Sequence, residues 1–275
     1  MNQARVWYAL LMHYWIRPSP ILSSRALFAP MITTSHVSLL EVDYNMHKSN
    51  STYFADLDVG RSHLVAFLCR AGIATVSNNR ISKLIMDPRT GAPATGKPGI
   101  MLGAVHSSFK REIAPFARFE MWSRVMAWDR KWLYIVTHFV PAGVAKPTEW
   151  FDQGFGSRGL RKRAAAVEAQ TTDWESKVFA SCVSKYVFKL GRLTIHPAVI
   201  LDESGLLPQR PGGWLVESAD MEPLSNDLTN DHSKWTWQRV EAQRRRGLEL
   251  AANLQALDGL SALFDGGDHG ALAVF

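Results

Sequence analysis

One helical pattern followed by three consecutive strand-like runs constrains the fold of this chain more than any other feature. From residue 52 to residue 70, apolar side chains recur at helical spacing, which predicts a long, mostly buried helix that stops at Gly72. A loop rich in Gly and Pro follows at 87–99. Aromatic and β-branched residues then dominate three runs, which predict successive strands at 100–113, 116–128 and 131–140.

The order of these elements indicates how they assemble. A shorter strand-like run at 35–42 precedes the helix, a β-rich run spans 177–193, and a second helical pattern covers 233–257. Asp129 and Arg130 suit a tight hairpin turn, so we expect antiparallel neighbours. The strand that follows this turn is apolar on both faces and should be covered on two sides. The sequence predicts an α+β fold in which an antiparallel sheet wraps one long helix, and not a doubly wound sheet.

Length and composition limit the alternatives. The chain has 275 residues, 47% of them apolar and 20% charged, as expected for a globular protein of one large or two small domains. Its formal net charge of +6 suits anionic partners without identifying one. Basic residues are scattered and no recognised nucleic-acid module occurs, so we expect no nucleic-acid binding. Cys69 and Cys182 are too few for a disulfide scaffold, and both are expected to be reduced.

The N-terminal run at 6–16 is apolar and aromatic, but it has about half the roughly 20 residues that a membrane-spanning helix needs. It also lacks the pattern of a secretory signal. Two interpretations remain open, a helix packed in the protein or a dimer, and an interfacial anchor that uses its Trp and Tyr side chains. We expect a cytoplasmic protein with at most peripheral membrane contact through this segment.

Several catalytic and cofactor templates are missing from the sequence. It contains no Gly-x-Ser-x-Gly elbow, no His-Glu-x-x-His helix and no close His/Cys cluster with metal spacing, so we expect no metal and no cofactor. Glycines at 154–159 match a dinucleotide fingerprint only formally, because no strand leads into them. Arg158 and Arg161 beside these glycines could bind a phosphate, or they could belong to a solvated basic loop.

A polar cluster lies between the first strand and the long helix, where capping alone would need a single side chain. Asn50 or Ser51 could supply that cap. The cluster also places a carboxylate and an imidazole before the positive end of the helix dipole. A carbonyl held at this helix end would meet a backbone N–H that stabilises an oxyanion, while Asp43 could activate water or attack. The polar residues are Asp43, Asn45, His47, Ser49, Asn50 and Ser51.

Three stretches carry a family resemblance. Residues 43–53 resemble the signature Asp-x-x-Gly-His-x-Asn-Asn-x-x-Tyr of hotdog-fold acyl-thioesterases of the 4-hydroxybenzoyl-CoA type. Residues 119–134 are similar to the Glu-x-x-x-Arg-x-x-x-Trp-Asp-x-(Lys/Arg)-Trp-x-Tyr hairpin of thioesterase-superfamily member 6 and its fungal relatives. Residues 184–197 also resemble those fungal proteins. The three stretches occur in the family's order.

The resemblance implies roles for individual residues. Asp43 would act as general base or nucleophile, the backbone N–H of Asn50 would polarise the carbonyl, and His47 would orient or support. Ser51 and Tyr53 would contact the substrate, with Tyr53 lining an acyl tunnel along the helix. Two positions depart from the signature, because Met46 replaces Gly and Ser49 replaces the first Asn. Since Met disfavours positive φ, we expect a reshaped loop.

The resemblance further implies a hotdog domain at 34–200, with extensions at 1–33 and 201–275 and an insertion at about 141–174. It implies a hydrolase for acyl-CoA or carrier-bound acyl chains in fungal polyketide or lipopeptide biosynthesis. Subunits would pair as a homodimer or a higher homo-oligomer, and a synthase could be a further partner. The alternative is an acyl-binding or scaffold protein that keeps the hotdog fold without turnover. A hydratase or dehydratase would need an Asp/His pair in a different motif, which is absent from the sequence.

Overall fold

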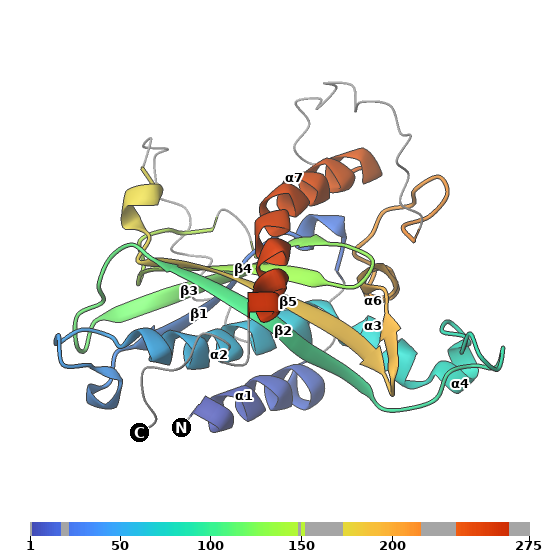
Figure 1. The fold of residues 1–275 in the computed structure, drawn as a ribbon, viewed down its shortest axis with the longest axis horizontal. Coiled ribbons are helices and arrows are strands. Elements are labelled where there is room, and N and C mark those ends of the chain that lie inside the picture. The colour runs from blue at the N-terminus through green and yellow to red at the C-terminus, as the bar shows by residue number, and fades with distance from the viewer. Residues whose placement is uncertain (1, 18–21, 148–149, 152–172, 216–234, 264–275) are drawn as a thin grey trace.

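The computed structural model describes residues 2–17, 22–147, 150–151, 173–215 and 235–263. An antiparallel sheet wraps a central helix, α2, which lies along one face of the sheet (Figure 1). The strands follow the order β1-β3-β4-β5-β2, and a short β6 pairs with β5. Their bounds are β1 Met31–His36, β2 Pro98–Phe109, β3 Arg118–Trp128, β4 Leu133–Pro141, β5 Ala180–Leu190 and β6 Leu193–Ile195. This is the predicted α+β hotdog arrangement.

Helices cover both faces of the sheet. On the inner face, α1 packs against the side of α2 that is turned away from the sheet (Figure 1). On the outer face, α7 crosses β3. The α-helices are α1 Asn2–Leu11, α2 Asn50–Leu68, α3 Arg70–Ser77, α4 Asn79–Ser82, α6 Pro197–Glu203 and α7 Trp237–Ala256. A π-helix, Met12–Ile16, extends α1, and 3-10 turns occur at Ser24–Ala26, Leu39–Glu41, Glu175–Lys177 and Leu257–Leu263.

The predicted strands after the long helix are confirmed, with ends shifted by a few residues. The hairpin between β3 and β4 closes where the N–H of Asp129 donates to the carbonyl of Trp132 over 3.0 Å. The Asp129 carboxylate also accepts the backbone N–H groups of Lys131 and Trp132, at 2.7 and 2.6 Å. Almost every residue of β4 is buried, as its two apolar faces predict.

Two boundary predictions are wrong. The strand expected at 35–42 lies earlier, at β1, and the chain then forms the 3-10 turn Leu39–Glu41. Ser38 and Glu41 form a capping box there, because the Glu41 carboxylate reaches back to the backbone N–H of Ser38 over 3.3 Å. Gly72 does not stop the helical region. It lies inside α3, where a Cβ would stand 2.1 Å from the carbonyl oxygen of Ile200, so it serves close packing against α6.

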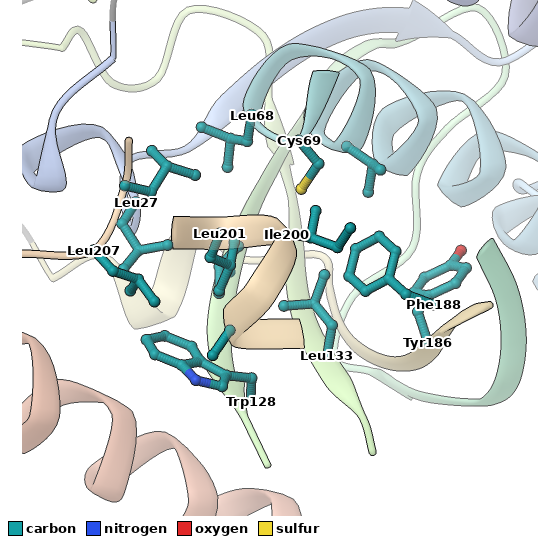
Figure 2. Packing of buried hydrophobic residues seen from close by; sticks show 14 of the residues in the cluster. Leu27, Leu68, Cys69, Trp128, Leu133, Tyr186, Phe188, Ile200, Leu201 and Leu207 are labelled. Carbon is teal, nitrogen blue, oxygen red and sulfur yellow. The ribbon is translucent and has the colours of Figure 1, made fainter. Parts of the chain in front are cut away.

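The interior contains two main hydrophobic clusters under α2. The larger one joins the C-terminal half of α2 to α6 and to the far ends of β3, β4 and β5, and Figure 2 shows part of it around Trp128, Ile200 and Leu201. The smaller one lies under the first two turns of α2. Its buried members are Val37, Tyr53, Leu57, Ile113, Phe119, Met121, Phe139, Phe179, Ala180 and Cys182.

A buried polar layer separates the two clusters. Arg61 lies on α2 between Leu57 and Leu64, with only 2% of its surface exposed. Its Nη1 donates to Ser184 Oγ of β5 over 2.6 Å. Ser123 and Thr137 of the neighbouring strands share a hydroxyl hydrogen bond of 2.8 Å. These hydrogen bonds satisfy the hydroxyl groups of the layer and one end of the Arg61 guanidinium, while Arg61 Nε has no hydrogen-bond partner among the described residues.

The N-terminal helix is docked on α2 by polar contacts. Arg5 pairs with Asp56, and His13 Nε2 lies 3.0 Å from His63 Nδ1. Its outer face leaves Trp7, Tyr8 and Trp15 exposed. Among the helices that the structure describes, none combines the length and the apolar character needed to span a bilayer. The segment therefore packs against α2 within one chain, while its exposed aromatic side chains leave the interfacial interpretation a prediction.

Candidate functional site

The predicted site is a tight loop between the 3-10 turn and α2. The N–H of Asp43 donates to the carbonyl of His47, and the N–H of Met46 donates to the carbonyl of Asp43, each over 3.1 Å. Val42 and Lys48 form an antiparallel bridge that closes the loop. Met46 adopts φ +60°, the left-handed conformation that the family's Gly would take freely. Met46 therefore accepts the positive φ that it was expected to avoid, and the reshaping of the loop stays a prediction.

The Asp43 carboxylate is held at the rim of this loop. Its Oδ1 accepts the backbone N–H of Asn45 over 2.9 Å and lies 3.6 Å from His47 Nδ1. The side chain is 23% exposed, so it is neither buried in the core nor free in bulk solvent. A carboxylate in such a place can accept a proton from water or a substrate group.

His47 lies between two carboxylates. Its Nδ1 faces Asp43, and its Nε2 lies 3.8 Å from Glu112 Oε1 just beyond β2. Nδ1 also lies 3.4 Å from the carbonyl oxygen of Lys48. The imidazole therefore connects the Asp43 loop to the segment after the edge strand β2, which fits the predicted supporting role.

The first turn of α2 presents free backbone donors beside the loop. Ser49, and not Asn50 or Ser51, is the N-cap residue, which corrects the capping prediction. Its side chain caps no helix N–H, and its carbonyl accepts the N–H and the hydroxyl of Thr52 at 3.0 and 2.7 Å. Within the described parts of the chain, the N–H groups of Asn50 and Ser51 have no hydrogen-bond partner. These donors stand at the positive end of a 19-residue helix and could hold an oxyanion.

The two predicted substrate-contacting residues that the structure describes, Ser51 and Tyr53, differ in their environment. Ser51 is exposed, and its hydroxyl lies 3.1 Å from that of Ser49. Tyr53 is buried, with ring centroids 5.0 Å from Phe109 and 4.8 Å from Phe139, and this burial raises the pKa of its hydroxyl. Arg158 and Arg161 lie outside the described residues. The structure thus brings Asp43, His47, Asn50 and Ser51 together on one loop and helix end.

A set of charged side chains that the sequence motif does not include lies directly beneath the loop. Lys48 and Asp56 have fully buried side chains, and Lys48 Nζ lies 2.8 Å from Asp56 Oδ2. Arg5 of α1 and Glu41 of the 3-10 turn also reach this pair. A signal was present, because Asp56 stands three residues after Tyr53 and therefore on the same face of α2 as that buried ring. The part of the chain that the structure describes holds no group of three metal-binding side chains.

Comparison with known proteins identifies the family of this chain. Residues 37–172 match the thioesterase-like superfamily. The chain is 35% identical over 273 residues to thioesterase poxG of Penicillium oxalicum, an alignment that covers 96% of this chain and 81% of poxG. It is 33% identical over 260 residues to the probable thioesterase atnL of Emericella nidulans, which covers 93% and 78%.

A solved structure, the probable thioesterase YbaW of Escherichia coli, aligns over 64% of this chain and 96% of its own, with a TM-score of 0.41 and 11% identity. The two fungal relatives match this chain over most of its length and of their own. This chain therefore belongs to the thioesterase-like superfamily.

Proposed function

We propose that the protein hydrolyses acyl thioesters at the loop and helix start formed by 43–51. The observation that carries this function is the joint placement of the partly shielded Asp43 carboxylate and the unpartnered N–H groups that open α2. Membership of the thioesterase-like superfamily and the names of the fungal relatives support the same activity.

In the proposed reaction, Asp43 takes a proton from a water molecule as that water attacks the thioester carbonyl carbon. The carbonyl oxygen becomes an oxyanion, which the Asn50 N–H stabilises at the helix N-terminus. The C–S bond then breaks, and the departing thiolate takes the proton from Asp43, which leaves a carboxylic acid and a thiol. His47 keeps the Asp43 carboxylate oriented through its Nδ1. General-base catalysis of this kind contributes about 10²–10⁴ in rate.

The substrates that fit this proposal are acyl-CoA esters or carrier-bound acyl and polyketide chains of fungal secondary metabolism, since relatives called thioesterases come from Penicillium oxalicum and Emericella nidulans. Tyr53 would line the acyl site beside Phe109, and Arg158 and Arg161 would meet the phosphates of CoA or of a carrier arm. A protein that binds acyl chains without turnover remains the second candidate. Neither the names of the fungal relatives nor the positive φ that Met46 adopts favours it.

An assay with a panel of acyl-CoA esters and a thiol-trapping dye tests the proposal. Wild type should release CoA well above background, and Asp43→Asn should lower kcat about 10²–10⁴-fold, because the general base is lost. The matched control is Glu112→Gln, which removes the other, exposed carboxylate near His47 and should retain most activity. Equal release by wild type and Asp43→Asn would reject catalysis, and acyl-CoA binding without release would favour the second candidate.

We also propose that two copies pair along β2. This strand is the edge of the sheet, and it exposes Ile100, Met101 and Leu102 together with one row of unpaired backbone groups. Phe109 at the end of β2 touches Tyr53, so pairing here would place a second copy beside the candidate site. Met101→Lys should convert a dimer to a monomer in analytical ultracentrifugation. A wild type that sediments as a monomer would reject the pairing.

For location, we propose a cytoplasmic protein that touches membranes only through α1. The exposed Trp7, Tyr8 and Trp15 are side chains suited to the lipid headgroup region, and the net positive charge favours anionic headgroups. Flotation with vesicles of phosphatidylcholine and phosphatidylserine should recover wild type, and a Trp7→Ala/Trp15→Ala variant should remain unbound. Equal recovery of both proteins would reject this contact.

A further inference from the structure

A buried lysine lies directly beneath the candidate site. Lys48 follows His47 in the loop, and its side chain is fully buried. Its ammonium lies 2.8 Å from Asp56 Oδ2 and 3.4 Å from Glu41 Oε2. It also lies 5.3 Å from the ring centroid of Tyr53 and 5.2 Å from that of Phe119, which is cation–π range. A charge without water at this depth is stable only because these partners surround it.

The N-terminal helix completes the arrangement. Asp56 uses its second oxygen, Oδ1, to accept Arg5 Nη1 of α1 over 3.0 Å. Two cations, Lys48 and Arg5, and two anions, Asp56 and Glu41, therefore balance one another. We call these four side chains the Lys48 network. It joins α1, the second turn of α2 and the 3-10 turn that precedes the loop.

The main chain around Lys48 fixes the loop at the same place. The N–H of Lys48 donates to the carbonyl of Ile113 over 2.9 Å, and the N–H of Ser49 donates to the carbonyl of Glu41 over 2.7 Å. Asp43 stands five residues before Lys48 and Asn50 two residues after it. The side chain and the backbone of Lys48 thus hold the segment that carries both proposed catalytic groups.

We propose that Lys48 is a positioning residue for hydrolysis, and that Arg5 makes the docked α1 helix part of the same positioning device. This inference rests on the proposed function, because it assigns Asp43 and Asn50 their roles. If the Lys48 network loosens, the loop can shift relative to the start of α2. A misplacement of about 1 Å between a base and an oxyanion donor can cost roughly 10²-fold in rate.

The chain offers a matched control. Lys185 of β5 is equally buried, binds Asp258 at 2.5 and 2.6 Å, and faces the ring of Trp132 at 4.8 Å. It lies on the outer face of the sheet, among residues that contact α7, and does not touch the loop. Lys48→Met and Lys185→Met therefore each remove a buried ammonium. The first breaks a pair in which both side chains are buried, and the second breaks a pair whose carboxylate, Asp258, is 59% exposed.

We expect Lys48→Met to lower kcat on the best acyl-CoA ester about 10²-fold with KM nearly unchanged, because the reacting groups are displaced while acyl contacts remain. Lys185→Met should keep the wild-type kcat once both variants are assayed well below their melting temperatures. Equal losses of kcat in the two variants would show a general loss of stability and overturn the inference.

Arg5 provides the second pair of variants, since its half-exposed side chain can be changed with less risk to folding. Arg5→Met should lower kcat, and Arg5→Lys should restore most of it by keeping the charge beside Asp56. Amide hydrogen exchange gives a readout that needs no turnover: Arg5→Met should speed exchange of the amides at 43–50 and not of those in β4. Unchanged exchange there would reject the positioning role even if the enzyme is active. A wild type without thioesterase activity would reject the proposed function instead.

Discussion

His47 Nδ1 lies 3.6 Å from Asp43 Oδ1, and its other ring nitrogen lies 3.8 Å from Glu112 Oε1. One imidazole therefore faces the proposed base on one side and an exposed carboxylate on the other. This position between two carboxylates fits the proposed roles, in which His47 orients Asp43 and Asp43 transfers the proton.

Replacement of His47 tests this assignment. We expect His47→Gln to lower kcat about ten- to hundredfold, because a misplacement of the base by about 1 Å can cost roughly 10²-fold in rate. The loss should be smaller than that of Asp43→Asn, and CoA release by stopped assays would compare the two variants. A His47→Gln enzyme as inactive as Asp43→Asn would mean that the imidazole itself takes part in the proton transfer.

The left-handed conformation of Met46 predicts a stabilising substitution. An L-residue in this conformation costs about 1–2 kcal/mol, and the side chain of Met46 is largely exposed, so little packing is lost when it is removed. Met46→Gly should therefore raise the free energy of unfolding by about 1 kcal/mol in urea titrations and preserve activity. Tyr44→Gly, at an exposed neighbour without positive φ, should not stabilise. A destabilised Met46→Gly protein would show that the backbone at Met46 is not strained.

At Gly72, where α3 contacts α6, we expect a substitution to lower the stability of the protein instead. Alanine favours a helix by about 1 kcal/mol over glycine, but its Cβ would stand 2.1 Å from the Ile200 carbonyl oxygen. Overpacking costs about 1–3 kcal/mol, so Gly72→Ala should lower the melting temperature. Gly99→Ala in β2, where a Cβ meets nothing within 4 Å, is the control and should be near neutral. A Gly72→Ala protein as stable as wild type would show that α6 can move away.

Because of a histidine at the interface between α1 and α2, we expect the free energy of unfolding to depend on pH. Burial first, and then the charges of Arg17 and Arg5, lower the pKa of His63 to about 4. In the unfolded chain His63 has a pKa near 6.5. Between pH 6.5 and 4 it is therefore protonated in the unfolded state and neutral in the folded state. The free energy of unfolding should fall in this range as the pH falls, by up to about 3 kcal/mol.

Denaturant titrations across this pH range measure the effect. His63→Gln should flatten the decline, because Gln does not titrate, whereas His36→Gln at the exposed end of β1 should leave it as in wild type. His13, 3.0 Å from His63, belongs to the same interface, so its replacement is a further arm of the experiment. An unchanged slope in His63→Gln would place the acid sensitivity elsewhere.

Much of the fold was predictable because the periodic patterns are long. The α2 helix and the strands β2 to β5 each carry enough apolar or β-branched residues to set their type. The error at β1 has a local cause, the capping box of Ser38 and Glu41, whereas the error at Gly72 has a tertiary cause. In the sequence Gly72 is a typical signal for the end of a helix. In the structure the nearby backbone of Ile200 makes glycine necessary inside α3. The division into extensions at 1–33 and 201–275 stays a prediction.

The residues of the proposed loop could be predicted from the sequence, whereas the charged side chains that support the loop could not. Asp43, His47 and Asn50 stand close in sequence, so a motif can name them. The Lys48 network joins positions as distant as Arg5 and Asp56, whose contact depends on how α1 docks. A lysine beside a histidine in a polar loop gives no local sign that its ammonium will be fully buried.

The polar layer of Arg61, Ser123, Thr137 and Ser184 affects how the molecule unfolds, because it separates the two hydrophobic clusters. The proposed site rests on the smaller cluster, which contacts the first two turns of α2, while α6 rests on the larger one. Warming or dilute denaturant should therefore inactivate the proposed site while most of the tertiary structure is still folded. Activity should be lost at a lower temperature or denaturant concentration than global unfolding.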